Sequence, residues 1–244
     1  MLRLGGLAVL ALAATAEAQP AVELRQAPPS GTAATSSAEC AAAPYECAVA
    51  RVERGEFASA VRTLEPWLRK TPGNLKGLNL LGLALTGAGR IDEANARFRE
   101  ALALDPHFYP ARKNLAINEF DRGRRTEAAR HFEQVLQRVP DDPIAHVHLG
   151  EILFERNDTA GALAHYRKGQ ARIAQNPAWQ LHFAMSLLAV GDRREAVSVL
   201  EALPSADGRS LFEAGVALAR AGAPAEAARF FDRASRGHED SYAA

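Results

Sequence analysis

The sequence predicts an all-α fold, a right-handed solenoid of about six stacked helix–turn–helix repeats. The leading observation is a pattern that recurs about every 34 residues, which is typical of stacked helix pairs. A second is the composition: 48% of the 244 residues are hydrophobic and only 7% are aromatic, so small and aliphatic side chains fill the expected core. A third is that glycine and proline fall at fixed places in the copies. The two clearest copies contain Leu81, Gly82, Gly89, Ala94, Phe98, Ala101 and Pro106, and then Leu115, Ala116, Gly123, Ala128, Phe132, Val135 and Pro140.

Each copy of the pattern predicts two amphipathic helices joined by a turn. In the first copy Leu81 and Leu85 fall on one helical stripe, and Gly89 allows the left-handed backbone that ends the first helix. Phe98 lies on the stripe of the second helix, where small residues opposite it let the two helices approach closely. Pro106 prevents extension of the second helix. The strict spacing therefore follows from packing.

These positions resemble the tetratricopeptide repeat, in which a large residue, Leu-Gly and an apolar residue are followed by Ala, Phe, Ala and Pro. The resemblance covers residues 41–240 and is to an exported, bacterial-type member of that class. The copy near Pro143 departs from the pattern, with Asn157 where Gly is usual and Gly169 where Ala is usual. The predicted repeats are residues 41–74, 75–108, 109–142, 143–176, 177–207 and 208–240.

The end of the chain has its own pattern. Residues 236–240 have the composition of a linker between repeats, and residues 241–244 then predict the start of a further, truncated helix. No polar capping helix follows, although the ends of solenoids need one for solubility. Two interpretations remain: the chain is a portion of a longer protein, or a partner caps its last repeat.

The first 18 residues predict a cleavable signal peptide. Arg3 precedes an apolar run from Leu4 to Ala14, and Ala16 and Ala18 provide a cleavage site of small residues. The run is too short to span a bilayer comfortably. Cleavage near Ala18 predicts a periplasmic or secreted protein with no membrane span after cleavage, and an uncleaved anchor is the alternative.

Between the signal and the repeats, residues 19–40 are rich in Ala, Pro, Ser and Thr, which predicts a flexible linker. Cys40 and Cys47 are the only cysteines. In an oxidising compartment this pair could close a small loop, so we expect a structural disulfide. The spacing is neither C-x-x-C nor C-x-x-C-H, which argues against a redox motif and a haem attachment site.

Charge and motifs exclude several functions. The 29 basic and 29 acidic residues balance, so nothing indicates a nucleic-acid partner, and the basic run 122–125 is interpreted as a solvated turn. The chain has no Gly-rich phosphate loop, no nucleophile elbow and no H-E-x-x-H zinc pattern. His146 and His148 are two apart on a helix and point in different directions, so they cannot share a metal ion. We therefore expect no enzymatic activity, no cofactor and no metal.

The resemblance implies a partner-binding groove, because the concave face of tetratricopeptide domains is lined by first-helix residues at equivalent positions. One stripe of such positions is Glu46, Leu80, Asn114, His148, His182 and Glu213, and a second is Tyr45, Asn79, Lys113, Val147, Leu181 and Phe212. A third is Leu83, Ile117, Glu151, Met185 and Val216, and a fourth is Thr86, Phe120, Phe154 and Leu188. The predicted groove residues are Lys76, Asn79, Lys113, Asn114, Ile117, Phe120, His148, Glu151, Phe154 and His182.

Asn114 is the residue of most interest in this set. Its amide can donate to and accept from the backbone of an extended peptide, while Lys113 and Lys76 could meet a carboxylate. The alternative is that these three residues are solvated helix positions. Phe120 and Phe154 could form an aromatic shelf for apolar side chains, or belong to packing between repeats.

Two features concern the chemistry of binding. Some tetratricopeptide domains hold a C-terminal carboxylate with a clamp of Lys, Asn and Arg, but Ile117 and His148 stand where the clamp has Asn. Such a clamp is therefore not expected. His148 and His182 would make binding sensitive to pH near neutrality, if they line the groove.

These observations lead to three functional hypotheses. The favoured one is a non-enzymatic scaffold that binds a peptide or protein segment in the concave groove. The second is the accessory region of a longer enzyme or envelope-assembly protein that is truncated at residue 244. The third is end-to-end self-association through exposed terminal repeats.

Overall fold

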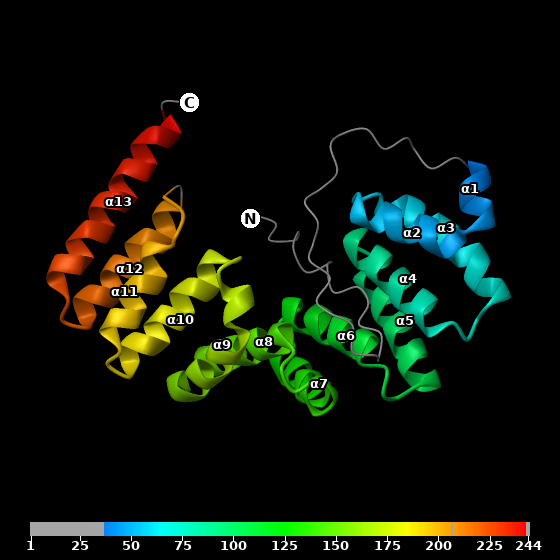
Figure 1. Ribbon diagram of the computed structural model, residues 1–244, viewed down its shortest axis with the longest axis horizontal. Coiled ribbons are helices and arrows are strands. Elements are labelled where there is room, and N and C mark those ends of the chain that lie inside the picture. Colours follow the sequence, from blue (N-terminus) through cyan, green and yellow to red (C-terminus); the bar gives the residue numbers. More distant parts are fainter. Residues whose placement is uncertain (1–36, 206, 243–244) are drawn as a thin grey trace. The chain divides into compact units, whose positions relative to one another are not determined.

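The computed structural model describes residues 37–205 and 207–242, with side chains described from Cys40 to Arg236 apart from residue 206. Within these residues the chain forms thirteen α-helices and no strand, and the predicted all-α solenoid is confirmed (Figure 1). The helices are α1 Ser37–Ala42, α2 Pro44–Glu53, α3 Phe57–Lys70, α4 Leu75–Gly87, α5 Ile91–Leu104, α6 Tyr109–Asp121, α7 Arg125–Arg138, α8 Pro143–Glu155, α9 Thr159–Ile173, α10 Pro177–Ala189, α11 Arg193–Glu201, α12 Gly208–Arg220 and α13 Pro224–Tyr242.

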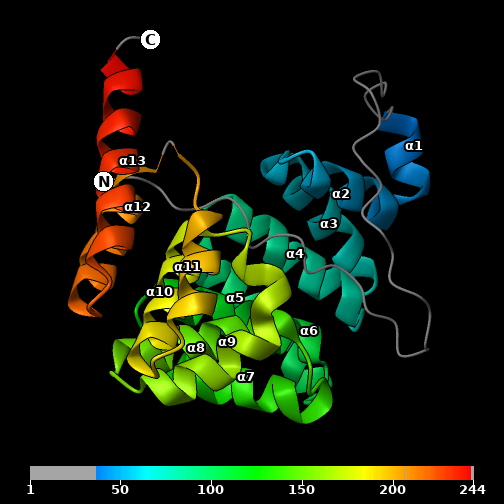
Figure 2. The ribbon, with the colours of Figure 1, turned by 60° about the vertical axis from the view of Figure 1, so that its left-hand side comes forward.

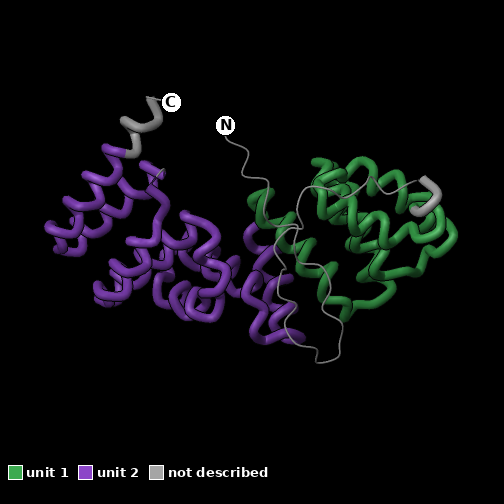
Figure 3. The backbone as a smooth tube through the Cα atoms, turned by 45° about the horizontal axis from the view of Figure 1, so that its top comes forward, with its two compact units in different colours: residues 1–124 green, residues 125–244 purple. Residues whose placement is uncertain are grey.

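The chain divides into two compact units, residues 1–124 and residues 125–244 (Figure 3). In the N-terminal unit, α2 pairs with α3 and α4 with α5, and α6 packs on α4 and α5. In the C-terminal unit, α8 pairs with α9, α10 with α11 and α12 with α13 (Figures 1 and 2). The first helices α10 and α12 also contact each other directly. Five of the predicted repeats thus each hold one helix pair, while the repeat at 109–142 holds α6 of the N-terminal unit and α7 of the C-terminal unit.

Left-handed residues end the first helix of every repeat. Gly89 has φ 78° and Gly191 has φ 85°, a conformation that a side chain disfavours. Around Gly89 the backbone closes with two hydrogen bonds, from the Arg90 N–H to the Leu85 carbonyl at 2.9 Å and from the Gly89 N–H to the Thr86 carbonyl at 3.0 Å. This pair of bonds satisfies carbonyls that the helix leaves open. Asn157 takes the same role after α8, with φ 62°.

Small residues allow close contact between the two helices of a repeat. A Cβ atom built on Gly82 would lie 2.3 Å from the Phe98 ring, and one built on Gly150 would lie 2.7 Å from the Tyr166 ring. Both distances are far inside van der Waals contact, so the aromatic ring occupies the space of the missing side chain. The prediction that these small residues serve packing is borne out in both units.

Each unit has its own hydrophobic core. In the N-terminal unit it includes Leu64 and Phe98, and in the C-terminal unit Tyr166, Phe183 and Phe230. These five side chains are almost completely buried. Each lies on the inner stripe of its helix, so one continuous core runs through the helix pairs of a unit.

Two expectations about the ends of the chain are corrected. Residues 37–40 were expected in the flexible linker, but they form the start of α1, where Ala and Glu favour a helix. Residues 236–240 were expected to link two repeats, with a new helix at 241–244, but α13 continues to Tyr242. The earlier second helices α3, α5 and α7 are each followed within two residues by a proline, and no proline follows Pro224. The predicted signal peptide and residues 19–36 lie outside the described residues.

Candidate functional site

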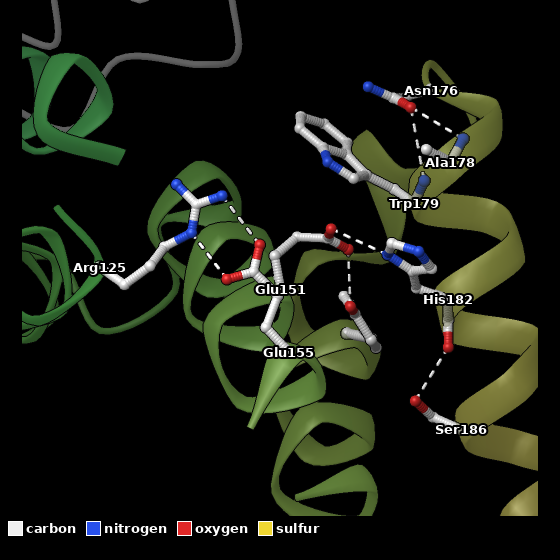
Figure 4. Close-up of polar contacts among 9 residues, drawn as sticks. Arg125, Glu151, Glu155, Asn176, Ala178, Trp179, His182 and Ser186 are labelled. Carbon is white, nitrogen blue, oxygen red and sulfur yellow. Dashed lines mark hydrogen bonds and ion pairs between the residues drawn. The ribbon is translucent and has the colours of Figure 1, made fainter. Parts of the chain in front are cut away.

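Capping residues set the phase of the first helices in the C-terminal unit. The Asn176 side chain accepts hydrogen bonds from the Ala178 N–H at 2.9 Å and the Trp179 N–H at 3.4 Å (Figure 4). Asp142 caps α8 in the same way, accepting from the Ala145 N–H at 2.9 Å. Because these caps fix where each helix begins, residues 34 positions apart take equivalent places on α8 and α10.

Glu151 is the central polar group between α8 and α10. Its side chain is buried and accepts a hydrogen bond from the Tyr166 hydroxyl at 2.6 Å. It accepts another from His182 Nδ1 at 2.9 Å (Figure 4). An ionised carboxylate can only accept, so His182 carries a proton on Nδ1 and donates a hydrogen bond to Glu151. Burial, followed by the nearby Glu151 charge, raises the pKa of Tyr166. The Tyr166 hydroxyl therefore stays a donor at physiological pH.

His182 makes two further contacts, one through its ring and one through its backbone carbonyl. The Phe154 ring stacks on it with the ring centroids 4.3 Å apart and an interplanar angle of 18°. Its backbone carbonyl accepts a hydrogen bond from the Ser186 hydroxyl at 2.9 Å. Phe154 comes from α8 and His182 from α10, so the stack joins two repeats. Three predicted groove residues, Glu151, Phe154 and His182, are thus brought together.

His148 occupies a different environment from His182. It stacks on Phe132 at a centroid distance of 4.9 Å, and Trp179 meets it edge-on at 5.6 Å. Burial lowers the pKa of His148 to about 4. A histidine that stays neutral when folded and ionises when unfolded destabilises the folded state as the pH falls below its unfolded pKa. His148 therefore stays neutral in the folded protein near neutral pH.

His146 pairs with His165 inside one repeat. The Nε2 of His146 lies 2.8 Å from the Pro140 carbonyl, and the two Nδ1 atoms are 2.9 Å apart. Because the carbonyl only accepts, His146 Nε2 donates to it, and one of the two Nδ1 atoms donates to the other. Burial, and then the proximity of His146, lowers the pKa of His165. The described side chains include no cluster of three or more metal ligands.

In the N-terminal unit, the predicted amides hydrogen bond to each other. Asn114 Nδ2 donates to Asn79 Oδ1 at 2.9 Å, which joins α6 to α4, and both side chains are buried. The Lys113 ammonium lies 6.0 Å from the centroid of the Tyr109 ring. Of the other predicted groove residues in this unit, Ile117 is buried, Phe120 is half-buried and Lys76 is exposed.

Deeper in the N-terminal unit, a second polar cluster surrounds Glu119. Asn118 Nδ2 donates to Asn95 Oδ1 at 2.8 Å, and the buried carboxylate of Glu119 lies 3.1 Å from Arg99 and 2.9 Å from Arg124. Two guanidinium groups therefore compensate one buried charge. This cluster was not among the predicted site residues, and it joins α5 to α6 as a structural element.

A cavity of about 620 Å³ lies between α10 and α12 in the C-terminal unit. Its apolar wall includes Phe212, which is a large hydrophobic side chain yet 56% exposed. The lining residues are Met185, Leu188, Ala189, Phe212, Glu213, Val216, Ala217, Arg220 and Ala221. Met185, Leu188, Phe212, Glu213 and Val216 belong to the four stripes predicted for the concave face, but none was among the selected groove residues.

The polar members of the cavity differ in their pairing. Glu213 Oε1 accepts a hydrogen bond from Arg209 Nε at 3.0 Å. Arg220 is exposed and has no hydrogen-bond or ion-pair partner among the side chains that the structure describes. The site thus combines an open apolar wall with a positive charge at its rim.

The comparison with protein families decides the classification. The tetratricopeptide repeat profile matches residues 45–112, 113–177 and 181–242, which is most of the chain. The chain belongs to the tetratricopeptide repeat family. Members of this family are typically scaffolds for protein interactions. Among curated proteins, none matches the sequence.

Solved structures of tetratricopeptide repeat proteins show the same fold. YrrB, described as a TPR protein with an unusual peptide-binding site, superposes with a TM-score of 0.62 at 19% identity, covering 72% of this chain and 93% of that one. The pilF protein of Pseudomonas aeruginosa gives a TM-score of 0.65 at 18% identity, covering 79% and 89%. MamA residues 41-end from Desulfovibrio magneticus RS-1 gives 0.54 at 19%, covering 65% and 90%. At these identities the likeness concerns the fold.

No helix in the described part of the chain combines the length and apolar character that a membrane crossing needs.

Proposed function

We propose that this tetratricopeptide repeat protein is a non-enzymatic scaffold that binds a peptide or protein segment on the inner face of its first helices. The observation that carries the proposal is the cavity between α10 and α12, lined at predicted inner positions and bearing the exposed ring of Phe212. Large apolar side chains that stay open to solvent at a concave surface mark partner-binding sites. The peptide-binding site of YrrB, a protein with this fold, gives further support.

The polar groups between α8 and α10 are engaged in contacts with one another. Glu151 uses both of its oxygens on Tyr166 and His182, and Phe154 covers one face of the His182 ring. These groups hold two first helices in register, which is a positioning role. Such a preorganised surface gains affinity because little ordering is needed when a partner binds.

Site-specific photo-crosslinking tests the location of binding. A photoreactive p-benzoylphenylalanine replaces Met185 in the cavity, and in the matched control it replaces Lys168, an exposed residue on the second helix α9 of the same unit. The proposal predicts crosslinked partner bands in cell-envelope extracts from the Met185 position and none from the Lys168 position. Equal crosslinking from both positions would place binding elsewhere and refute the proposal.

We also propose that the protein is exported, with cleavage near Ala18. The disulfide between Cys40 and Cys47, whose Cα atoms are 5.2 Å apart, supports an oxidising compartment. The test is the mass and N-terminal sequence of the protein recovered from the periplasm or medium of its source cells. A chain that begins at Gln19 and has no free thiol is expected. A chain that retains Met1 in the cytosolic fraction, with two free thiols, would contradict export.

A further inference from the structure

The cavity between α10 and α12 has a chemistry that specifies its occupant. Resting on the proposed function, we propose that it binds a linear peptide segment in which apolar side chains and a carboxylate stand about four residues apart. The apolar side chains enter the cavity beside Phe212 and Val216, and the carboxylate pairs with Arg220.

The apolar part of the motif follows from the wall of the cavity. Met185 and Leu188 of α10 face Phe212 and Val216 of α12, and the remaining apolar lining residues are alanines. The alanines leave room between the larger side chains, and Met185 adapts readily to different apolar shapes. A volume of about 620 Å³ lies within the range of cavities that hold ligands, so it accepts more than one side chain.

The acidic part of the motif follows from charge. The charges of the two charged lining residues, Glu213 and Arg220, would cancel if the two side chains paired. Glu213, however, already accepts a hydrogen bond from Arg209 on the same helix. Arg220 has no such partner among the described side chains, so the cavity presents a net positive charge at its rim. A carboxylate can take both ends of the guanidinium fork, whereas a basic segment is repelled.

The spacing within the motif follows from the helix. Phe212, Val216 and Arg220 occur at every fourth position of α12, so they lie on one side of it. Eight residues of α-helix advance about 12 Å, and an extended peptide covers that length in about four residues. The carboxylate therefore stands three to four residues from the apolar side chain that contacts Phe212.

The first experiment is selection from a random dodecapeptide library displayed on phage, with the mature chain as bait. The expected consensus has one or two large apolar residues separated by three to four positions from an Asp or Glu. The strongest peptide is then synthesised with a fluorophore, together with a version in which Lys replaces the acidic residue. By fluorescence polarisation, the Lys version should bind at least about tenfold more weakly.

Charge reversal in the protein locates the contact. Arg220→Glu should exchange the preference, so that the Lys peptide binds more tightly than the acidic one. Arg194→Glu is the matched control, because Arg194 is an exposed residue of α11 outside the cavity, and it should leave the preference unchanged. Met185→Asp should abolish binding of the acidic peptide. Far-UV circular dichroism and thermal unfolding confirm that each variant is folded.

The outcomes separate this inference from the proposed function. If peptides are selected but Arg220→Glu and Met185→Asp leave their binding unchanged, the inference is wrong and another part of the inner face binds them. If no peptide is enriched above bait-free resin, the inference fails, while photo-crosslinking from Met185 still decides the proposed function. If light scattering shows a dimer that Phe212→Ser converts to a monomer, the occupant is a second copy of this chain and the peptide proposal is overturned.

Discussion

The hydrogen bond from Tyr166 to Glu151 should account for a measurable part of the stability of the C-terminal unit. Glu151 is buried, and the Tyr166 hydroxyl donates to one of its oxygens at 2.6 Å. Tyr166→Phe removes that donor and leaves the oxygen without one. Hydrogen bonds to charged groups contribute about 1.5–3 kcal/mol, so we expect a loss of about 2 kcal/mol in the free energy of unfolding.

A control one turn along the same helix calibrates this value. Glu155 pairs with Arg125 at 2.7 and 2.8 Å, but its side chain is 42% exposed. Exposed ion pairs contribute less than about 1 kcal/mol, so Glu155→Gln should have a small effect. Both variants are measured by urea unfolding, followed by far-UV circular dichroism near neutral pH.

A double-mutant cycle completes the test. Glu151→Gln keeps an oxygen that can accept from Tyr166 but removes the charge, so the two substitutions should not be additive. We expect a coupling energy of about 1 kcal/mol between Tyr166→Phe and Glu151→Gln. Additive effects, or a cost for Tyr166→Phe no larger than that for Glu155→Gln, would refute the assignment of Glu151 as the polar centre of this unit.

Three further predictions concern pH, turn geometry and the disulfide. Because burial lowers the pKa of His148 to about 4, the free energy of unfolding should fall by about 2 kcal/mol as the pH falls from about 7 to about 5. His148→Phe should remove this part of the pH dependence of the urea midpoint. Both Asn157 and Gly89 have positive φ. Asn157→Gly should therefore raise the free energy of unfolding by about 0.5 kcal/mol, and with it the thermal unfolding temperature, whereas Gly89→Ala should lower both, the free energy by about 1–2 kcal/mol. Joint replacement of Cys40 and Cys47 by Ser should reduce the stability of α1 packed on α2 by about 2.5 kcal/mol. Amide hydrogen exchange should become faster in α1 and stay unchanged in α8–α12.

The repeats could be predicted from the sequence because their determinants are local. The left-handed turn at Gly89 and the contact of Gly82 with Phe98 each depend on residues within one helix pair. Asn157 fits the same logic, because Asn is the residue after Gly that best tolerates positive φ. The helical pairs therefore fall where the periodic pattern places them.

The ends of the described chain were predicted less well. A proline follows the end of α3, α5 and α7, but no proline follows Ala234. The linker predicted at residues 236–240 was therefore placed only by analogy with the earlier repeats. The helix α1 consists of only six residues, which is too short for a periodic signal. In both places, the deciding factor was the absence or weakness of a local signal.

The candidate site shows where periodicity stops being informative. Val147, Leu181 and Phe212 occupy equivalent positions, yet the first two are almost fully buried and Phe212 is 56% exposed. In the C-terminal unit, α10 packs on α8 and α12 packs on α10, and no later first helix covers α12 among the described residues. Exposure therefore depends on the neighbouring repeat. Tyr166 was also missed as a polar partner, because its position in the repeat is normally that of an apolar Phe.

The most direct test of the central claim uses Met185, which is the only methionine after the predicted cleavage near Ala18. A chain of residues 19–244, freed from a fusion partner and labelled with ¹³C on its methionine methyl group, should give a single methyl resonance from the wall of the cavity. A selected acidic–apolar peptide that occupies the cavity should shift this resonance, with the same dissociation constant that fluorescence polarisation gives. Saturating binding that leaves the Met185 resonance unmoved would contradict it.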